Sequence, residues 1–317
     1  MMEQRKKIII DTDCGSDDAM AIAMALNDLR YQVLMFSTVS GNVPMEQATI
    51  NTLTTIEYAD TYAPPVYRGC DKMILRNLSY AYETHGHDGM GDIGLVPRRL
   101  QAEKENGVFK MLEFLRNNDD KEIDIIALGP LTNIALALRL DYEAMKRANR
   151  LIIMGSAGLG AGNATPVAEF NIWQDAEAAK IVVESGLENI TFVGWDACLE
   201  ECMLTPDEIS TIRDSGSLGK FAIDCNKDLM EMNIERFGDK YLDMADPSAV
   251  AAALYPECVE ICQKYYCEVD ASAGPSYGAV IVDVNNCTGK TPNAYICSRL
   301  NAEKYKAYIY KTLRVNK

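Results

Sequence analysis

Four carboxylates lie within eight residues near the N-terminus, directly after the apolar run that ends at Ile10, in the order Asp11-Thr12-Asp13-Cys14-Gly15-Ser16-Asp17-Asp18. Like charges at this spacing repel one another, and a cation bound among them would remove the repulsion. Carboxylate oxygens favour hard ions such as calcium or magnesium. The alternative is that Asp17 and Asp18 only complement the dipole of a helix start, which leaves Asp11 and Asp13 unexplained. We therefore predict a metal site here.

A second polar group follows the apolar run that ends at Met154. The loop over residues 162–172 contains Asn163, Glu169 and Asn171, which together offer donors and acceptors. Such a set suits the neighbouring hydroxyls of a sugar, each of which can donate and accept. Loops rich in asparagine also bond only their own backbone, and this loop by itself leaves both interpretations open.

Apolar runs that alternate with helical stretches must position these groups. The pattern predicts an α/β fold in which a mostly parallel sheet is flanked by helices, as a single domain over residues 1–317. Ligands of such sheets bind outside the carboxyl ends of the strands, where both polar groups lie. The expected strands are Lys7 to Ile10, Gln32 to Val39, Ile123 to Leu128, Leu151 to Met154, Ile190 to Val193 and Ala279 to Val284, with Ala294 to Cys297 as a further candidate.

Helices are expected between these strands. The segment Asp17 to Leu29 should form a buried helix, because its core from Ala19 to Leu26 is apolar on every side. The segment Ser217 to Tyr241 is rich in charged residues and methionine, and it is either a helical cap that closes over a ligand or a solvated helix pair. Further helices are expected at Thr132 to Leu140, Asp175 to Glu184 and Ser248 to Leu254.

The charge balance narrows the class of partner. A formal net charge of −15 and a pI near 4.7 argue against nucleic acid or an anionic membrane as a partner, and favour a small neutral or cationic molecule. Residues Met1 to Lys7 are polar, so we expect no signal region and a cytoplasmic protein. The ten cysteines lack paired CxxC spacing, which favours reduced thiols over zinc ligands or disulfides.

Four motifs together resemble the inosine-uridine preferring nucleoside hydrolases. They are Asp-Thr-Asp-x-Gly-x-Asp-Asp-Ala from residue 11, Gly-Pro-Leu-Thr-Asn at 129–133, Gly-Asn-x-Thr-Pro-x-Ala-Glu-Phe-Asn at 162–171, and Asp246-Pro247. The resemblance implies a nucleoside as substrate, a Ca²⁺ cofactor and a homodimer or homotetramer. The implied calcium ligands are Asp13, Asp18, the backbone carbonyl of Leu128 and Asp246. The implied ribose-binding positions are Asp17, Asn42, Met154, Asn163, Glu169 and Asn171, with Asp246 shared.

The resemblance also implies the chemistry. Asp13 removes a proton from a water that calcium has activated, and this water attacks the anomeric carbon of the ribosyl group. Many family members have a histidine just before the late calcium aspartate, where it protonates the leaving base, or a tryptophan that stacks on a purine. This chain has Ala245 there. We expect the remaining leaving-group donors to be His85, which matches a family loop position, or Arg236 or Tyr241 in the possible cap.

Two residues near these motifs are expected to be structural. Cys14 replaces a proline of the family motif, and the surrounding aspartates should disfavour its thiolate. Trp195 does not occupy the base-stacking position, and we expect it to pack below the sheet edge.

Two other functions remain open. Because Ala245 removes the usual leaving-group acid, the chain could be a catalytically weak homologue that binds ribose or nucleosides. The pair Asp11-x-Asp13 after a strand is also typical of phosphatases of the haloacid dehalogenase type. That mechanism, however, needs further groups downstream, whereas here the Asp17-Asp18 pair follows at once.

Overall fold

The computed structural model describes residues 5–315 of the 317-residue chain. Residues 1–4, which are part of the polar segment discussed above, lie outside the described residues. One eight-stranded sheet dominates the fold, in the order β3-β2-β1-β4-β5-β6-β10-β7, and a separate two-stranded sheet pairs β8 with β9. The strands are β1 Lys6–Thr12, β2 Tyr31–Thr38, β3 Val66–Arg68, β4 Ile123–Ala127, β5 Arg150–Met154, β6 Ile190–Val193, β7 Val259–Tyr265, β8 Cys267–Val269, β9 Val280–Val282 and β10 Ala294–Leu300.

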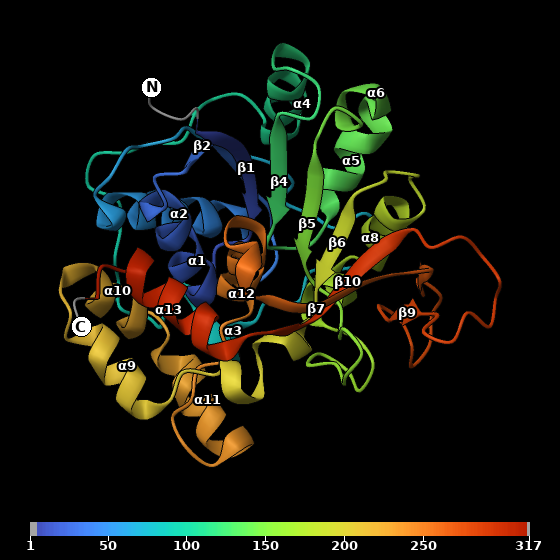
Figure 1. Cartoon of the computed structure of the whole chain (residues 1–317). Coiled ribbons are helices and arrows are strands. Elements are labelled where there is room, and N and C mark those ends of the chain that lie inside the picture. The colour runs from blue at the N-terminus through green and yellow to red at the C-terminus, as the bar shows by residue number, and fades with distance from the viewer. Residues whose placement is uncertain (1–4, 316–317) are drawn as a thin grey trace.

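All neighbouring pairs of the main sheet are parallel except β10 and β7, so the prediction of a mostly parallel α/β fold is confirmed. Helices cover both faces (Figure 1). They are α1 Ser16–Asn27, α2 Met45–Ala59, α3 Tyr82–His85, α4 Gly107–Asn117, α5 Thr132–Leu140, α6 Tyr142–Met145, α7 Phe170–Gln174, α8 Ala176–Val183, α9 Pro206–Arg213, α10 Ser217–Asp224, α11 Lys227–Phe237, α12 Ala245–Leu254 and α13 Ala302–Thr312.

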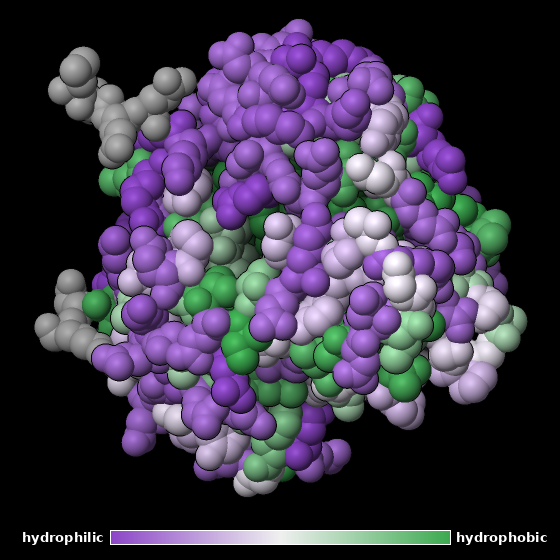
Figure 2. All heavy atoms as spheres, turned by 45° about the vertical axis from the view of Figure 1, so that its right-hand side comes forward, coloured by the Kyte–Doolittle hydropathy of each residue, from purple (hydrophilic) through white to green (hydrophobic). Residues whose placement is uncertain are grey.

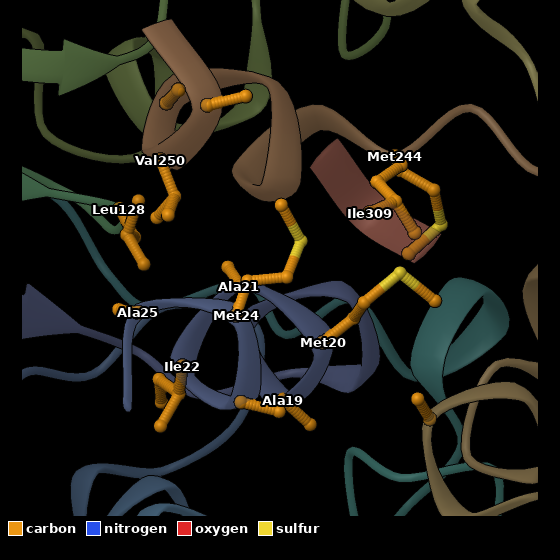
Figure 3. Packing of buried hydrophobic residues seen from close by; sticks show 14 of the residues in the cluster. Ala19, Met20, Ala21, Ile22, Met24, Ala25, Leu128, Met244, Val250 and Ile309 are labelled. Atoms are coloured by element: carbon orange, nitrogen blue, oxygen red, sulfur yellow. The ribbon is translucent and has the colours of Figure 1, made fainter. Parts of the chain in front are cut away.

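Helix α1 is the centre of one core. Its residues from Ser16 to Leu26 are all buried, as its all-round apolar sequence predicts. Met20 and Met24 of α1 point toward α12 and α13, where Met244 and Ile309 lie (Figure 3). The second core, on the opposite face of the sheet, contains buried residues of α4, α5 and α8. Because α1 is enclosed on every side, the aspartates at its first turn are held rigidly.

The strand order places the end of β1 at the centre of the sheet. Strand β1 pairs with β2 on one side and with β4 on the other, so the chain order reverses at this point. Crevices at such switch points, beyond the carboxyl ends of the strands, are where open α/β sheets bind ligands. The acidic run from Asp11 to Asp18 and the turn that begins at Leu128 both lie at this edge.

Two features of the sheet differ from the prediction. The run Ala279 to Val284 was expected in the main sheet, but only Val280–Val282 forms a strand, and it pairs with β8 in the small sheet. The expectation was wrong because an apolar run does not specify its pairing partner. Here a turn in which the Gly278 amide donates to the Asp270 carbonyl (2.7 Å) folds the chain back on β8. Strands β3, β7 and β8 were not predicted; β7 is a largely exposed edge strand without a buried apolar pattern.

The surface matches the polar composition. Hydrophilic residues dominate the face in Figure 2, with hydrophobic residues scattered between them. Within residues 5–315, none of the helices combines the length and the apolar character that crossing a membrane requires. The prediction of a single domain over residues 1–317 stays a prediction.

Candidate active site

Four buried aspartates form what we call the acidic floor: Asp13, Asp17, Asp18 and Asp246. Asp13 follows β1, Asp17 and Asp18 lie in the first turn of α1, and Asp246 lies in the first turn of α12. One carboxylate oxygen from each of Asp17, Asp18 and Asp246 lies within 4.8 Å of the others. The packing of α1 against α12 therefore brings together residues that are more than two hundred positions apart in the chain.

Only one of the two carboxylate oxygens of Asp13 has a hydrogen-bond partner. The backbone amide of Asn42 donates to Asp13 Oδ2 (2.7 Å), whereas Oδ1 is buried and has no hydrogen-bond partner among the described residues. The backbone of two glycines encloses this carboxylate closely, because a Cβ atom at Gly41 or Gly129 would overlap it. A buried, unpartnered carboxylate oxygen is costly, so it indicates a missing cation or proton.

Asp18 is bonded on both oxygens. The Thr12 hydroxyl donates to Oδ1, and the Gly15 amide donates to Oδ2 (2.8 Å). Burial first, and then repulsion by Asp17, raise the pKa of Asp18 to about 7. Burial and then the charge of Asp18 raise the pKa of Asp13, and burial and then the charge of Asp17 raise that of Asp246. Without a cation, the acidic floor therefore resists full ionisation at neutral pH.

The acidic floor fits a divalent hard cation. Its donors are carboxylate oxygens, and the Leu128 carbonyl, which lines the same cavity, accepts from the Asn171 side chain (2.6 Å). The predicted ligands were Asp13, Asp18, the Leu128 carbonyl and Asp246. The group whose carboxylate oxygens lie within 4.8 Å of one another contains Asp17 with Asp18 and Asp246, and sequence spacing alone did not reveal this part for Asp17.

A cavity of about 130 Å³ opens above the acidic floor, with Asp17 and Asp246 at its base. Asn171 belongs to the short helix α7, Glu169 directly precedes this helix, and Met154 is the last residue of β5. The structure brings all the predicted ribose-binding residues to the lining of this one cavity, namely Asp17, Asn42, Met154, Asn163, Glu169 and Asn171. The two polar groups recognised in the sequence therefore lie in the same cavity.

Glu169 is both a helix cap and a cavity residue. Its carboxylate accepts from the amides of Asn171 (2.9 Å) and Ile172 (3.3 Å) at the start of α7, and from the amide of Ser156 (3.3 Å). Burial raises the pKa of Glu169 to about 7, against these hydrogen bonds, which lower it. Asn163 Oδ1 accepts from the Phe170 amide (2.9 Å), so here the loop bonds its own backbone and lines the cavity at once.

The lining of the cavity also contains Trp195, Arg236, Asp243 and Ala245, a group that we call the mouth. Trp195 Nε1 donates to Asp243 Oδ2 (3.1 Å), and Arg236 Nη1 lies 3.8 Å from the same oxygen. The Arg236 guanidinium lies 5.5 Å from the centre of the Trp195 ring. One buried carboxylate therefore positions both an aromatic face and a cation at the mouth.

The expectation that Trp195 packs below the sheet edge is wrong. A 3₁₀ turn over Trp195–Cys198 follows β6, and the Trp195 amide donates to the Ser156 carbonyl (3.0 Å). This turn folds the chain back across the end of the strand, so the indole lines the cavity. Asp243, which positions it, was not singled out in the sequence, although it lies only three residues before the Asp246-Pro247 motif.

The three predicted leaving-group donors have different surroundings. His85 is buried and lines the cavity, and Arg236 of α11 also lines it. Among the described residues, Tyr241 is not part of the cavity lining. Tyr241 follows the end of α11, and its role as a leaving-group donor stays a prediction. Of the expected cap, α11 covers the cavity with Leu229, Met232 and Arg236.

His85 has an assignable tautomer. The Ser16 amide donates to His85 Nδ1 (3.3 Å), and the Ser16 hydroxyl lies 2.7 Å from the same nitrogen. A backbone amide can only donate, so Nδ1 is the acceptor and the proton of the neutral ring is on Nε2. Burial lowers the pKa of His85, although the nearby charge of Asp17 opposes this. His85 is thus a neutral donor beside the cavity, whereas His87 is exposed and packs against Tyr82.

Cys14 is buried beside the acidic floor. Burial and the charge of Asp18 raise the pKa of its thiol well above the usual value, so the thiolate is strongly disfavoured. This agrees with a structural role for Cys14.

Known proteins share both the sequence and the fold. The chain matches the family model of inosine-uridine preferring nucleoside hydrolases over residues 8–307. It is 30% identical over 312 residues to the pyrimidine-specific ribonucleoside hydrolase RihB of Escherichia coli strain SE11, covering 98% of each chain. It superposes on a plant nucleoside hydrolase, the PpNRh1 enzyme, with a TM-score of 0.91 and 27% identity over 99% of this chain and all of the other. A purine-preferring ribonucleoside hydrolase from Gardnerella vaginalis gives a TM-score of 0.89 and 27% identity, with 97% and 98% of the two chains covered. The chain therefore belongs to the inosine-uridine preferring nucleoside hydrolase family.

Proposed function

We propose that this protein hydrolyses the N-glycosidic bond of ribonucleosides, releasing a free base and ribose, with Ca²⁺ bound at the acidic floor. The observation that carries the proposal is the convergence of four buried aspartates beneath a cavity lined by amides and a carboxylate. Buried like charges favour a divalent cation with oxygen ligands. The cavity above them offers both donors and acceptors to the hydroxyls of a pentose.

The cation ligands that we propose are Asp13, Asp18, the Leu128 carbonyl and Asp246, with Asp17 completing the acidic floor. When bound, calcium supplies a Lewis acid that acidifies water and holds vicinal hydroxyls. Asp13 Oδ1 has no other partner in the described chain and takes the proton of the attacking water. The Asn42 amide fixes the other oxygen of Asp13 and so orients it for this transfer.

The cavity residues stabilise the charge that develops as the bond breaks. The anomeric carbon gains oxocarbenium character, and the carboxylates of Asp17 and Glu169 face this positive charge. Glu169 needs to be ionised for this role, and its pKa of about 7 makes it sensitive to pH. Asn163 and Asn171 hold the sugar from the side of α7, and Met154 packs against it.

The mouth assists the departing base without the usual histidine. The Arg236 guanidinium acts by donating hydrogen bonds to the base as negative charge builds up. The neutral His85 can donate from Nε2. The relatives named above differ in base preference by their names, so the base that this chain prefers has to be measured.

Release of reducing sugar from a panel of purine and pyrimidine ribonucleosides tests the proposal. We expect release with saturating calcium, loss of release after treatment with a chelator, and recovery when calcium is added back. If none of the ribonucleosides is cleaved with calcium present, the hydrolase proposal is wrong.

Ala245 motivates a second candidate, a catalytically weak homologue that binds ribose or nucleosides. Titration calorimetry separates the two, because binding without turnover would support this candidate.

The phosphatase alternative predicts magnesium-dependent phosphate release that is lost in Asp11→Asn. In the structure, Asp11 Oδ1 accepts hydrogen bonds from the Ser37 hydroxyl and from the Asn133 side chain (2.7 Å), so this oxygen already has two partners within the protein.

A homodimer or homotetramer and a cytoplasmic location are further proposals, to be tested by light scattering and by cell fractionation.

A further inference from the structure

Cys262 and Cys297 lie opposite each other on β7 and β10, the edge strand and its neighbour at one end of the main sheet. Strands β7 and β10 run antiparallel, side by side (Figure 1), and the register pairs Cys262 directly with Cys297. Directly opposed residues of antiparallel strands point to the same face, with Cα atoms about 4.5–5.5 Å apart. A disulfide requires about 4.4–6.8 Å. The Cα spacing of a directly opposed pair therefore lies within the range that a disulfide spans.

The two thiols differ in accessibility and acidity. Cys262 is exposed on the edge strand, whereas Cys297 is buried. A hydrogen bond from the Cys297 thiol lowers the pKa of Cys262, and the same bond, together with burial, raises the pKa of Cys297. An exposed thiol with a lowered pKa beside a second thiol is the arrangement of an attacking and a resolving cysteine.

The other cysteines lack this combination. Cys287 is the second exposed thiol among the described residues, on the loop after β9. Burial raises the thiol pKa of Cys14, Cys70, Cys198, Cys202, Cys225, Cys258 and Cys267. Cys287 is thus a matched control, exposed but without a thiol opposite it in a strand register.

We propose that Cys262 and Cys297 form a reversible disulfide when the protein meets a peroxide. The Cys262 thiolate attacks one peroxide oxygen, the O–O bond breaks, and a sulfenic acid and hydroxide form; the hydroxide takes up the proton that the Cys262 thiol released and becomes one water. The Cys297 thiol then attacks the Cys262 sulfur, forming the S–S bond and releasing the second water. The two thiols lose two electrons and hydrogen peroxide gains them, and a thiol reductant reverses the step.

This site is separate from the acidic floor but adjoins the mouth. The Cys297 carbonyl accepts from the Gly194 amide (3.3 Å), and Gly194 directly precedes Trp195. A disulfide at this position ties the edge strand to the strand that supports the Trp195 turn. The inference concerns thiol chemistry and is independent of the proposed hydrolysis.

The test is oxidation of the reduced, full-length protein with hydrogen peroxide, followed by thiol blocking and digestion with trypsin plus a glutamate-specific protease. This digestion isolates Cys262 in residues 261–264 and Cys297 in residues 291–299. Mass spectrometry then detects the linked pair directly. The experiment is repeated with Cys262→Ser and with the control Cys287→Ser.

We expect the 261–264 peptide linked to 291–299 as the main cross-linked product, lost on reduction, absent from Cys262→Ser and unchanged in Cys287→Ser. Either of two results overturns the proposal: Cys262 oxidised to sulfinic or sulfonic acid while Cys297 stays a thiol, or Cys262 linked mainly to another cysteine. Far-UV circular dichroism of Cys262→Ser confirms that the absence of the link is not caused by unfolding.

Discussion

The acidic floor and the mouth differ in how firmly the fold holds them. The acidic floor is buried, with Asp13 and Asp18 fully inaccessible, and it is built on the central strand β1 and the enclosed helices α1 and α12. The mouth depends on a turn after β6 and on α11, and the side chain of Arg236 is 34% exposed. A rigid buried site suits a fixed reacting group, while a more exposed one can accommodate different partners.

This difference separates the two halves of the proposed substrate. In the proposed complex the acidic floor faces the ribose, which is common to all ribonucleosides, and all four of its aspartates occur in the motifs by which the chain resembles its family. In the same proposal the mouth faces the base, and Ala245 of the mouth departs from the family pattern. We infer that the acidic floor governs whether hydrolysis occurs and that the mouth governs which base leaves and how fast. The predictions below test this division.

The largest effect is expected at the acidic floor, in Asp13→Asn. The amide cannot accept the proton of the attacking water, so we expect kcat for ribose release to fall by about 10²–10⁴, whichever base is attached. Reducing-sugar assays with a purine and a pyrimidine nucleoside measure the loss. The exposed Asp239→Asn removes the same charge outside the cavity and serves as the control, with kcat expected to stay unchanged. A loss restricted to one class of base would contradict the division.

At the mouth, Arg236→Gln should have a smaller effect that depends on the base. Losing hydrogen bonds to a base that is gaining negative charge costs about 1.5 kcal/mol, which is roughly tenfold in kcat. A nitrophenyl riboside, whose leaving group needs no such help, should be cleaved at an unchanged rate. The control is Arg213→Gln, an exposed arginine of α9 paired with Asp224. Equal losses with both substrates would show that Arg236 acts on folding or on the sugar instead.

Ala245→His should increase turnover modestly. Ala245 lines the cavity directly before Asp246, so a histidine side chain would extend into the mouth and could protonate the base. Because Arg236 and His85 already offer donors there, we expect about a fivefold gain in kcat, below the ~10² typical of general acid catalysis. Steady-state kinetics with natural nucleosides measure the change. An unchanged or lower rate would mean that the existing donors already do the work.

The sequence predicted the acidic floor better than the mouth, for physical reasons. Four aspartates in eight residues repel one another unless a cation is bound, so local spacing predicted a metal site, whereas the family resemblance gave Asp13 and Asp18 as its ligands. Trp195 and Asp243 meet only because the turn after β6 folds back toward α12, a long-range contact that no local pattern encodes. Helix α1 could be predicted because its apolar run is a local pattern. The pairing of β9 is not encoded locally, and β9 was therefore placed in the wrong sheet.

The smallest effect is expected in Asp196→Asn, next to Trp195 at the mouth. The Asp196 carboxylate accepts from the Leu159 amide (2.9 Å), and burial raises its pKa from the usual 3.8 to about 6. The folded protein therefore binds this proton more tightly than the unfolded chain, so the stability contributed by protonated Asp196 is lost as the pH rises from about 4 to about 6.

Asparagine keeps an acceptor for the Leu159 amide but does not titrate, so this part of the pH dependence should disappear. Partial exposure screens the charge, and we expect a difference of about 1 kcal/mol in unfolding free energy between the two ends of this range. Urea denaturation at several pH values with saturating calcium measures this difference. Calcium is added because an acidic floor that holds a cation contributes little to the change of unfolding free energy with pH. Asp196 has peptide amides rather than a cation as partners, so its contribution should be the same with and without calcium. If calcium removes it, the charge states of the acidic floor and of the turn that carries Trp195 are coupled, and the division between floor and mouth fails.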